Sequence, residues 1–237
     1  MNKLLAKSYD FYNEHMLHGQ NMDIDYYIRE LQNYQSKNIL VVGAGTGRVA
    51  IPISKDLFVD ALDIDQYRLQ VLQEKCPNIV CYNMDICKET PNKEYDAIIF
   101  PYSTIQLLGN EGNIALALLN CSKILTLNGV LIFDASESFN YKPDVDRMCL
   151  FEDYNKDIKS KISVYYQAKR FAEYIRFITE FYVHINNITL TEIEQYLYYD
   201  KNRMSELVNH SFNIEKIDNG YQNGLFLHKH LYHCKKR

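Results

Sequence analysis

Residues 38–65 read NILVVGAGTGRVAIPISKDLFVDALDID, and the order of residue types in this stretch decides the fold. The apolar, β-branched run at 39–42 is typical of a buried parallel strand. The glycines that follow allow a sharp turn and let a ligand approach the backbone closely. Residues 48–57 are expected to form a helix, which Pro52 fits poorly unless it lies in the first turn, and 58–62 form a second apolar run. The stretch therefore predicts consecutive elements of a parallel α/β sheet.

Asp63 ends the second apolar run, twenty residues after Gly43. At that place an acid can accept hydrogen bonds from the two hydroxyls of a ribose. The glycine spacing over 43–47 is GxGxG, whereas loops that cradle a pyrophosphate read GxGxxG. A tight strand-to-helix turn also needs glycine for structural reasons alone, so the loop by itself leaves both roles open.

An acid and an aromatic residue follow the next two predicted strands. Asp85 and Ile86 come after a third strand at 79–82, and Tyr102 comes after a fourth at 97–100. In an open α/β sheet, ligands bind beyond the carboxyl ends of the strands, near the point where the strand order reverses. Residues after the fourth strand are therefore expected beside the ligand. Tyr102 can orient a substrate there or pack as an ordinary aromatic residue, and Asp85 can be a plain loop residue.

Together these motifs resemble those of class I methyltransferases that use S-adenosylmethionine, a cofactor with a ribose and an adenine but no phosphate. The GxGxG loop resembles their first motif. The strand YDAIIF at 95–100, with its Pro-Tyr-Ser turn, is similar to small-molecule N-methyltransferases, including those acting on amino sugars. The resemblance spans most of the chain and is most specific over 38–134. It departs at Val41, where the family usually has an acid that anchors the methionine ammonium, so carbonyls of the Gly43 loop or Phe100 would have to replace that acid.

The resemblance implies an α/β, Rossmann-like sheet of about seven strands in the order 3-2-1-4-5-7-6. S-adenosyl-L-methionine would be the cofactor and S-adenosyl-L-homocysteine the product, with no metal ion. The residues that match cofactor-binding positions are Gly43, Ala44, Gly45, Gly47, Asp63, Ile64, Asp85, Ile86 and Phe100. Asp85 would meet the exocyclic amine of adenine, and Ile86 would pack on the ring. Tyr9 and Tyr102 are the candidate catalytic residues.

The chain is expected to form a single methyltransferase domain, residues 1–237, in four parts. These parts are an N-terminal helical cap or lid at 1–35, a cofactor-binding half at 36–135, an antiparallel insertion over the substrate pocket at about 160–200, and a final helix and strands at 201–237. Segments that precede the first strand of such folds often cap the cofactor. Tyr9 would then reach the methionine end of the cofactor, whereas a plain amphipathic helix packing on the core is the alternative.

Local patterns place the remaining elements. Helices are expected at residues 3–16, 23–34, 66–75 with Asp65 as N-cap, 112–126 and 201–210. Further strands are expected at residues 130–133, 161–169, 174–185, 189–199, 213–217 and 225–233. No helical pattern interrupts the run from 161 to 199, so its strands should pair antiparallel, with Asn186-Asn187 as a hairpin turn.

The amino-acid composition argues against several classes of partner and site. A chain of 237 residues can bury a sizeable core, and a net charge of −4 without a basic stripe argues against a nucleic-acid partner. The six cysteines include no CxxC pair, which indicates reduced thiols and a cytoplasmic protein. No signal peptide is present, and no apolar run reaches the roughly 18 residues needed to span a membrane. His228, His230, His233 and Cys234 indicate a surface strand rather than a metal site.

The sequence favours transfer of a methyl group to a small molecule or peptide, most readily to an amine nitrogen. An amine nucleophile must be neutral but needs no dedicated base, and no His-Asp or Lys-Asp pair identifies a base. An O-methyltransferase of a small hydroxylated metabolite and a non-catalytic cofactor-binding regulatory protein are the alternatives. A nicotinamide oxidoreductase fits less well, because the loop spacing does not suit a pyrophosphate. The oligomeric state stays open.

Overall fold

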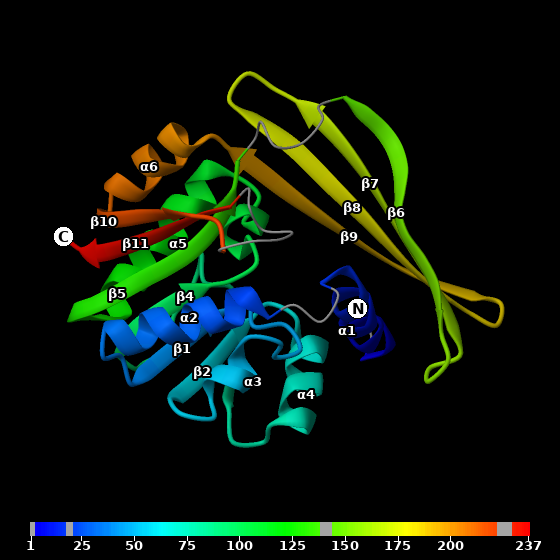
Figure 1. The fold of residues 1–237 in the computed structure, drawn as a ribbon, viewed down its shortest axis with the longest axis horizontal. Helices are drawn as coiled ribbons and strands as arrows, with labels where there is room; N and C mark the ends of the chain where they lie inside the picture. The colour runs from blue at the N-terminus through cyan, green and yellow to red at the C-terminus, as the bar shows by residue number, and fades with distance from the viewer. Residues whose placement is uncertain (1–2, 18–20, 138–143, 222–228) are drawn as a thin grey trace.

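The centre of the molecule is a seven-stranded sheet (Figure 1). The computed structural model describes residues 3–17, 21–137, 144–221 and 229–237. The strands of this sheet are β1 (Asn38–Val42), β2 (Phe58–Asp63), β3 (Val80–Asn83), β4 (Tyr95–Phe100), β5 (Leu125–Ser136), β10 (Phe212–Asn219) and β11 (Lys229–Lys236). Their spatial order is β3-β2-β1-β4-β5-β11-β10. Since β10 and β11 come sixth and seventh along the chain, the predicted order 3-2-1-4-5-7-6 is confirmed.

Both faces of the sheet are buried. Strands β1 to β5 run parallel, and β11 lies antiparallel between β5 and β10. Leu40 and Val42 of β1 pack in one apolar cluster, and Ile39 and Val41 pack in another. Successive side chains of a strand point to opposite faces, so a strand covered on both sides must be apolar throughout. This requirement explains why residues 39–42 identify β1 in the sequence.

Helices cover the two faces of the sheet, as Figure 1 shows. They are α1 (Lys3–Met16), α2 (Met22–Asn33), α3 (Ala50–Ile53), α4 (Gln66–Lys75), α5 (Glu111–Ile124) and α6 (Lys201–Asn209), with a 3₁₀ turn, η1, at Thr104–Leu107. Helices α2, α3 and α4 pack in the cluster around Ile39, and α5 and α6 pack in the cluster around Leu40. Asp65 caps α4 as predicted, because its carboxylate accepts the backbone N–H groups of Tyr67 and Arg68.

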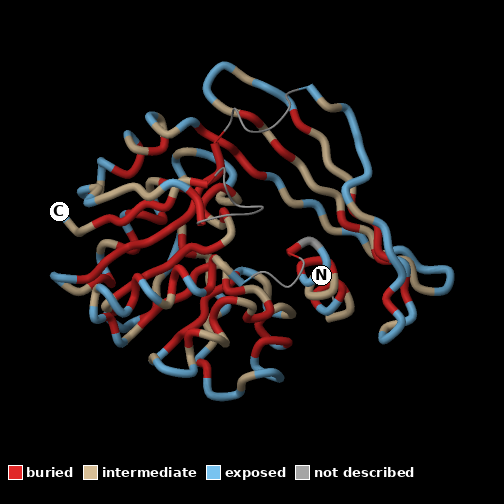
Figure 2. The backbone as a smooth tube through the Cα atoms, in the orientation of Figure 1, coloured by how far each residue is buried: buried red, intermediate tan, exposed pale blue. Residues whose placement is uncertain are grey.

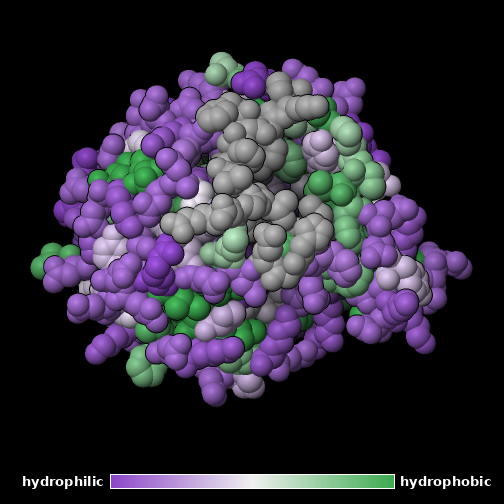
Figure 3. Space-filling view, in the orientation of Figure 1, coloured by the Kyte–Doolittle hydropathy of each residue, from purple (hydrophilic) through white to green (hydrophobic). Residues whose placement is uncertain are grey.

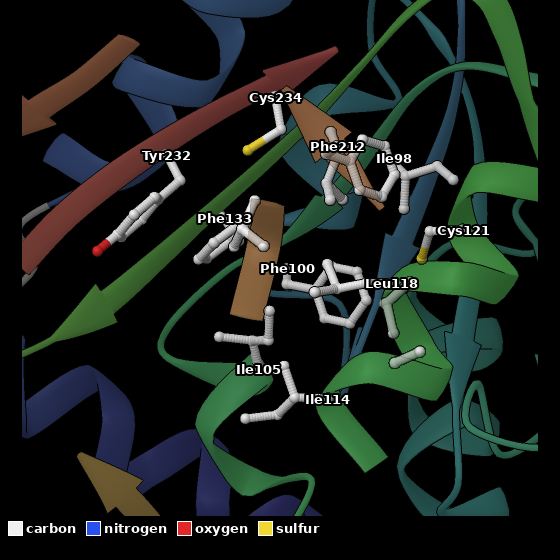
Figure 4. Close-up of a cluster of buried hydrophobic side chains, with 14 of the residues drawn as sticks. Ile98, Phe100, Ile105, Ile114, Leu118, Cys121, Phe133, Phe212, Tyr232 and Cys234 are labelled. Atoms are coloured by element: carbon white, nitrogen blue, oxygen red, sulfur yellow. The ribbon is translucent and has the colours of Figure 1, made fainter. Parts of the chain in front are cut away.

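The larger cluster fills the space between the sheet and α5 (Figure 4). Phe133 of β5 and Tyr232 of β11 stack with ring centroids 4.6 Å apart. Phe100 of β4 is fully buried there with Leu118 of α5. Figure 2 shows the buried residues concentrated in the sheet and on the inner sides of its helices. The rigid core thus holds the carboxyl ends of β1, β2 and β4, where the site is built.

An insertion between β5 and α6 forms a second, four-stranded antiparallel sheet. Its strands are β6 (Val145–Asn155), β7 (Ser160–Arg170), β8 (Tyr174–Ile185) and β9 (Ile188–Tyr199), in that spatial order. The three predicted strands and the turn at Asn186-Asn187 are confirmed, since β8 pairs directly with β9 and Asn186 has a φ of 51°. Strand β6 was not predicted. Its pairing with β7 shifts register twice, so its sequence does not alternate regularly.

Helix α1 lies between the insertion and the rest of the chain (Figure 1). Leu5 and Tyr12 pack against Ile162, Val164 and Phe181 of the insertion in a separate apolar cluster. The helix also contacts α4 and the strands β6 and β9. Residues 3–16 are therefore helical as predicted, and they lie across the carboxyl end of the central sheet.

Several predicted bounds are wrong. The helix expected at 48–57 is only α3, because from Ser54 onward the chain tightens into turns that lead into β2. The helix expected at 112–126 ends at Ile124, and β5 begins at once at Leu125. Asn128-Gly129 therefore lies within β5 rather than before it. The strand expected at 225–233 continues to Lys236, beyond its predicted end. The surface strand expected there is also wrong, because β11 lies between β5 and β10 with His233 and Cys234 fully buried. Residues 222–228, which include His228, lie outside the described residues.

The face shown in Figure 3 is largely hydrophilic, with scattered apolar residues. Exposed apolar side chains of the insertion include Met148, Ile188 and Ile193. Within the described ranges, no helix has both the length and the apolar character required to cross a bilayer.

Candidate active site

A cavity of about 470 Å³ lies at the carboxyl ends of β1, β2 and β4. Its walls come from the glycine loop after β1, the loops after β2, β3 and β4, helix α1 and strand β9. Nine of the predicted site residues line it: Tyr9, Gly43, Ala44, Gly45, Asp63, Ile64, Asp85, Ile86 and Tyr102. Gly47 and Phe100, which were also predicted, are not among the lining residues. The structure therefore brings together side chains from separate strands at the expected edge of the sheet.

The glycine loop needs its glycines for two different reasons. Gly43 has a φ of +66°, and a Cβ at that position would collide with the side chain of Thr104. Its N–H donates to the carbonyl of Leu62 at 2.8 Å, which ties the loop to β2. A Cβ at Gly47 would meet Ile51 and Leu72. Gly47 thus permits close packing of the helices behind the loop and has a structural role.

Asp63 lies at the end of β2 with its carboxylate against the glycine loop. One oxygen accepts the N–H of Gly45 at 2.7 Å, and the other accepts the N–H of Asp65 at 2.9 Å. Burial raises the pKa of Asp63 above its ordinary value, while the Arg68 guanidinium acts in the opposite direction. The two backbone N–H groups fix the orientation of the Asp63 carboxylate. Each of its oxygens has two lone pairs, so each can accept one more hydrogen bond.

Asp85 and Ile86 lie in the loop after β3. The Asp85 carboxylate accepts the N–H of Cys87 at 3.0 Å and pairs with the Lys88 ammonium at 2.9 Å. Burial alone would raise the pKa of Asp85, but the hydrogen bonds from Lys88 and Cys87 outweigh it and lower the pKa. Ile86 is 3% exposed, whereas Ile64 across the cavity is 72% exposed. The cavity therefore has a polar acceptor and apolar surface side by side.

Phe100 takes no part in the cavity through its side chain, which lies within the core cluster in Figure 4. Its carbonyl accepts a long hydrogen bond, 3.4 Å, from the hydroxyl of Tyr27. Phe100 therefore lies behind the cavity wall, and its predicted contact with the cofactor stays a prediction.

The turn after β4 is held by Asp134, which the sequence did not identify. Tyr102 and Ser103 have φ values of 59° and 60°, a left-handed backbone conformation that is strained for residues other than glycine. Each donates its backbone N–H to one oxygen of the Asp134 carboxylate at 2.6 Å. Asp134, at the end of β5, is fully buried. The carboxylate thus fixes a strained turn at the edge of the cavity.

Lys229 balances the buried charge of Asp134. Its ammonium pairs with one carboxylate oxygen, and the hydroxyls of Tyr27 and Tyr221 donate to the other at 3.0 and 2.8 Å. Burial by itself would raise the pKa of Asp134, but the Lys229 ammonium outweighs it and holds the pKa below its ordinary value. A fully hydrogen-bonded buried pair of this kind specifies a single arrangement of the turn.

The ring of Tyr102 lies close to two cations. The Arg48 guanidinium is 5.1 Å from the ring centroid, and the Lys229 ammonium is 4.8 Å from it. Arg48 makes a bidentate pair with Asp23, which is 1% exposed. Tyr102 is therefore packed at a fixed position, between the glycine loop and β11.

Strand β9 supplies two acids that the sequence did not single out. Arg68 of α4 donates to Glu192 at 2.8 Å and to Glu194 at 2.9 Å. The same guanidinium lies 4.3 Å from the centroid of the Tyr9 ring, and the Tyr9 hydroxyl approaches Glu194 at 3.4 Å. These contacts join the insertion, α1 and α4 across the mouth of the large cavity.

A second cavity of about 250 Å³ adjoins the first. Four residues line both: Tyr9, Tyr102, Glu194 and Tyr196. Most of its other walls are apolar or aromatic side chains of α1 and the insertion, such as Tyr12, Phe177 and Phe181. Two neighbouring cavities that share three tyrosines and a carboxylate in their walls can hold two reactants next to each other.

Acids and a histidine also gather away from these cavities, between α2 and the strands β10 and β11. Among the described residues, ligand atoms of Glu30, Asp218 and His233 lie within 4.8 Å of one another. The Lys216 ammonium bonds to Glu30 at 2.8 Å and to Asp218 at 3.0 Å, so a cation is already supplied by the chain. Burial lowers the pKa of His233 to about 4. This cluster is an internal network that packs α2 on the sheet.

The fold is shared with solved methyltransferase structures. The chain matches an S-adenosylmethionine-dependent methyltransferase from Clostridium acetobutylicum with a TM-score of 0.80 and 16% identity, over 97% of this chain and 98% of that one. It matches a sugar N-methyltransferase from Streptoalloteichus with a TM-score of 0.76 and 12% identity, over 97% and 92%. It matches an amino pentose methyltransferase from Micromonospora echinaspora with a TM-score of 0.73 and 12% identity, over 96% of each chain.

No family model matches the sequence. No curated protein matches it either. The comparison therefore rests on three-dimensional structure, with strand order, insertion and nearly full coverage in agreement. The chain has the fold of the class I S-adenosylmethionine-dependent methyltransferases.

Proposed function

We propose that the chain is an S-adenosylmethionine-dependent methyltransferase that acts on a small molecule or peptide, most readily at an amine nitrogen. The observation that supports this most strongly is the large cavity, in which the Gly43 loop, Asp63 and Asp85 lie at the carboxyl ends of consecutive strands. The family motifs predicted that same set of residues from the sequence. The neighbouring second cavity, which shares Tyr9 and Tyr102 with the first, suits an acceptor.

The residues of the large cavity fit such a cofactor. Asp63 would accept from the ribose hydroxyls, and Asp85 with Ile86 would receive the adenine. The backbone of the Gly43 loop lies open to the methionine part. Val41, where the family usually has an acid, is fully buried on the face of the sheet that packs against α2 and α3. A carbonyl of the glycine loop is the remaining anchor for the methionine ammonium, since Phe100 does not line the cavity.

The cofactor supplies a methyl group on a sulfonium, and the chain supplies alignment and exclusion of water. Helix α1 and strand β9 contribute walls to both cavities, and Tyr9 and Tyr102 line both of them. We propose that helix α1 acts as a cap over both reactants, whereas α2, the rest of the cap expected at 1–35, packs on a face of the sheet. The solved sugar N-methyltransferase with the same fold supports nitrogen as the acceptor atom, although a hydroxyl acceptor remains the alternative.

The test is transfer of a labelled methyl group from S-adenosylmethionine to a matched pair of acceptors. Phenethylamine and phenethyl alcohol have the same shape and suit the aromatic second cavity; glucosamine serves as a polar amine. We expect label in an amine product and none in the alcohol. Label only in the alcohol would favour the O-methyltransferase alternative. Binding of S-adenosylhomocysteine without transfer to any acceptor would favour a non-catalytic cofactor-binding protein.

A further inference from the structure

Glu194 is placed where the two cavities meet. It lies on β9, lines both cavities, and its side chain is 13% exposed. Among the described residues that line the second cavity, it is the only carboxylate. Lys229 lines that cavity too, but its ammonium pairs with Asp134. A partly buried carboxylate therefore stands where the walls of the two cavities meet.

The orientation of the Glu194 carboxylate is fixed from three sides. Oε1 accepts from Nη2 of Arg68 at 2.9 Å. Oε2 accepts from the hydroxyl of Tyr196 at 2.8 Å and from that of Tyr9 at the long distance of 3.4 Å. A carboxylate offers about four acceptor sites, so these partners leave room for one more donor. Arg68 is shared with Glu192, so its single positive charge does not neutralise both acids.

We propose that Glu194 orients the acceptor amine and stabilises the positive charge that develops on its nitrogen. This inference rests on the proposed methyltransferase function. Glu194 accepts a hydrogen bond from an N–H of the neutral amine, which turns the nitrogen lone pair toward the methyl carbon. The lone pair forms the new N–C bond, the C–S electrons stay on sulfur, and the positive charge moves from sulfur to nitrogen.

Relative to the neutral amine, whose nitrogen carries no charge, the carboxylate stabilises the transition state and the product, in which the nitrogen is positive. The groups that face the Glu194 carboxylate are Arg68, Glu192, Tyr9 and Tyr196. None of the three that contact it directly is an acid. The acceptor ammonium gives its extra proton to water before the step, and the neutral nitrogen keeps its remaining protons during methyl transfer.

The test compares Glu194→Gln with Glu180→Gln. Glu180, on β8, likewise accepts from an arginine and a tyrosine, Arg147 and Tyr182, both at 2.9 Å, but it lines neither cavity. The probes are N-methylphenethylamine, which is cationic at neutral pH, and phenethyl alcohol, its neutral counterpart. Both are titrated into protein saturated with S-adenosylhomocysteine.

We expect the wild type and Glu180→Gln to bind the cation at least about tenfold more tightly than the alcohol. In Glu194→Gln that preference is lost, while affinity for the alcohol and for S-adenosylhomocysteine stays within about twofold. The kcat for phenethylamine falls about a hundredfold, the size expected for loss of one oriented group at the reacting charge. Glu194→Asp, which keeps the charge, retains part of the preference.

Equal affinity of the wild type for the cation and the alcohol would overturn the inference, as would an unchanged preference in Glu194→Gln. A parallel loss of alcohol and S-adenosylhomocysteine binding in both Glu194 variants would assign the residue a structural role and also overturn it. Failure of the wild type to bind S-adenosylhomocysteine at all is a different result, because it contradicts the proposed function itself.

Discussion

Asp134→Ala is expected to lower the free energy of unfolding by about 3–5 kcal/mol, because removing one partner of a buried ion pair leaves the other charge uncompensated. The Lys229 ammonium would lose its counter-ion. The backbone N–H groups of Tyr102 and Ser103 would lose their acceptor, so the strained turn after β4 would relax. Denaturant unfolding measures the change. Asp146→Ala, at an exposed position on β6, is the matched control and should stay within about 0.5 kcal/mol.

Asp134 is also expected to make the stability of the folded protein depend on pH. The folded state holds the pKa of Asp134 below its ordinary value of 3.8. A carboxyl with a lowered pKa binds its proton less readily when folded, so it stabilises the protein above about pH 4. That stabilisation is lost as the pH falls through the pKa of the folded state. Asp134→Asn should therefore lose less stability between pH 5 and pH 3 than the wild type, and identical acid-side losses would show that Asp134 does not carry this dependence.

Asp63→Ala is expected to weaken binding of S-adenosylhomocysteine by about 1.5–3 kcal/mol, or roughly ten- to more than a hundredfold, since hydrogen bonds to a charged acceptor are strong. The substitution also removes the acceptor for the N–H groups of Gly45 and Asp65. Asp63→Asn keeps one acceptor oxygen and the shape, so its loss should be smaller. Calorimetry measures both variants beside Asp146→Ala. Unchanged affinity in Asp63→Ala would remove Asp63 from the binding site.

The cofactor half of the fold could be predicted because its signals are local in sequence. In each unit an apolar strand, a turn and one polar residue follow each other within a short stretch, as at residues 38–63 and 79–86. The carboxyl ends of parallel strands lie at one edge of the sheet, so residues found separately in sequence had to meet in space. Asp63 and Asp85 were identified in this way, and both line the large cavity.

Asp134 was missed because its partners are remote in sequence. Its carboxylate is bonded by Tyr27, Tyr102 and Lys229, which come from α2, the turn after β4 and the start of β11. No spacing rule links such positions. The signal that was available is an acid at the end of an apolar strand, the same pattern that identified Asp63.

Glu192 and Glu194 were missed for another reason. Polar and apolar residues alternate along part of β9, which is typical of a strand with one face in water. The insertion instead turns the polar face of this part toward the large cavity, where Arg68 meets both acids. Alternation shows which residues share a face, but only the tertiary arrangement shows what that face covers.

The central claim is that the large cavity binds S-adenosylmethionine, and calorimetric titration of the intact chain with S-adenosylhomocysteine tests it most directly. We predict one equivalent of ligand bound per chain, competition by S-adenosylmethionine, and no heat of binding with the oxidised nicotinamide dinucleotide. Absence of S-adenosylhomocysteine binding, or binding of the nicotinamide dinucleotide at the same site, would contradict the account.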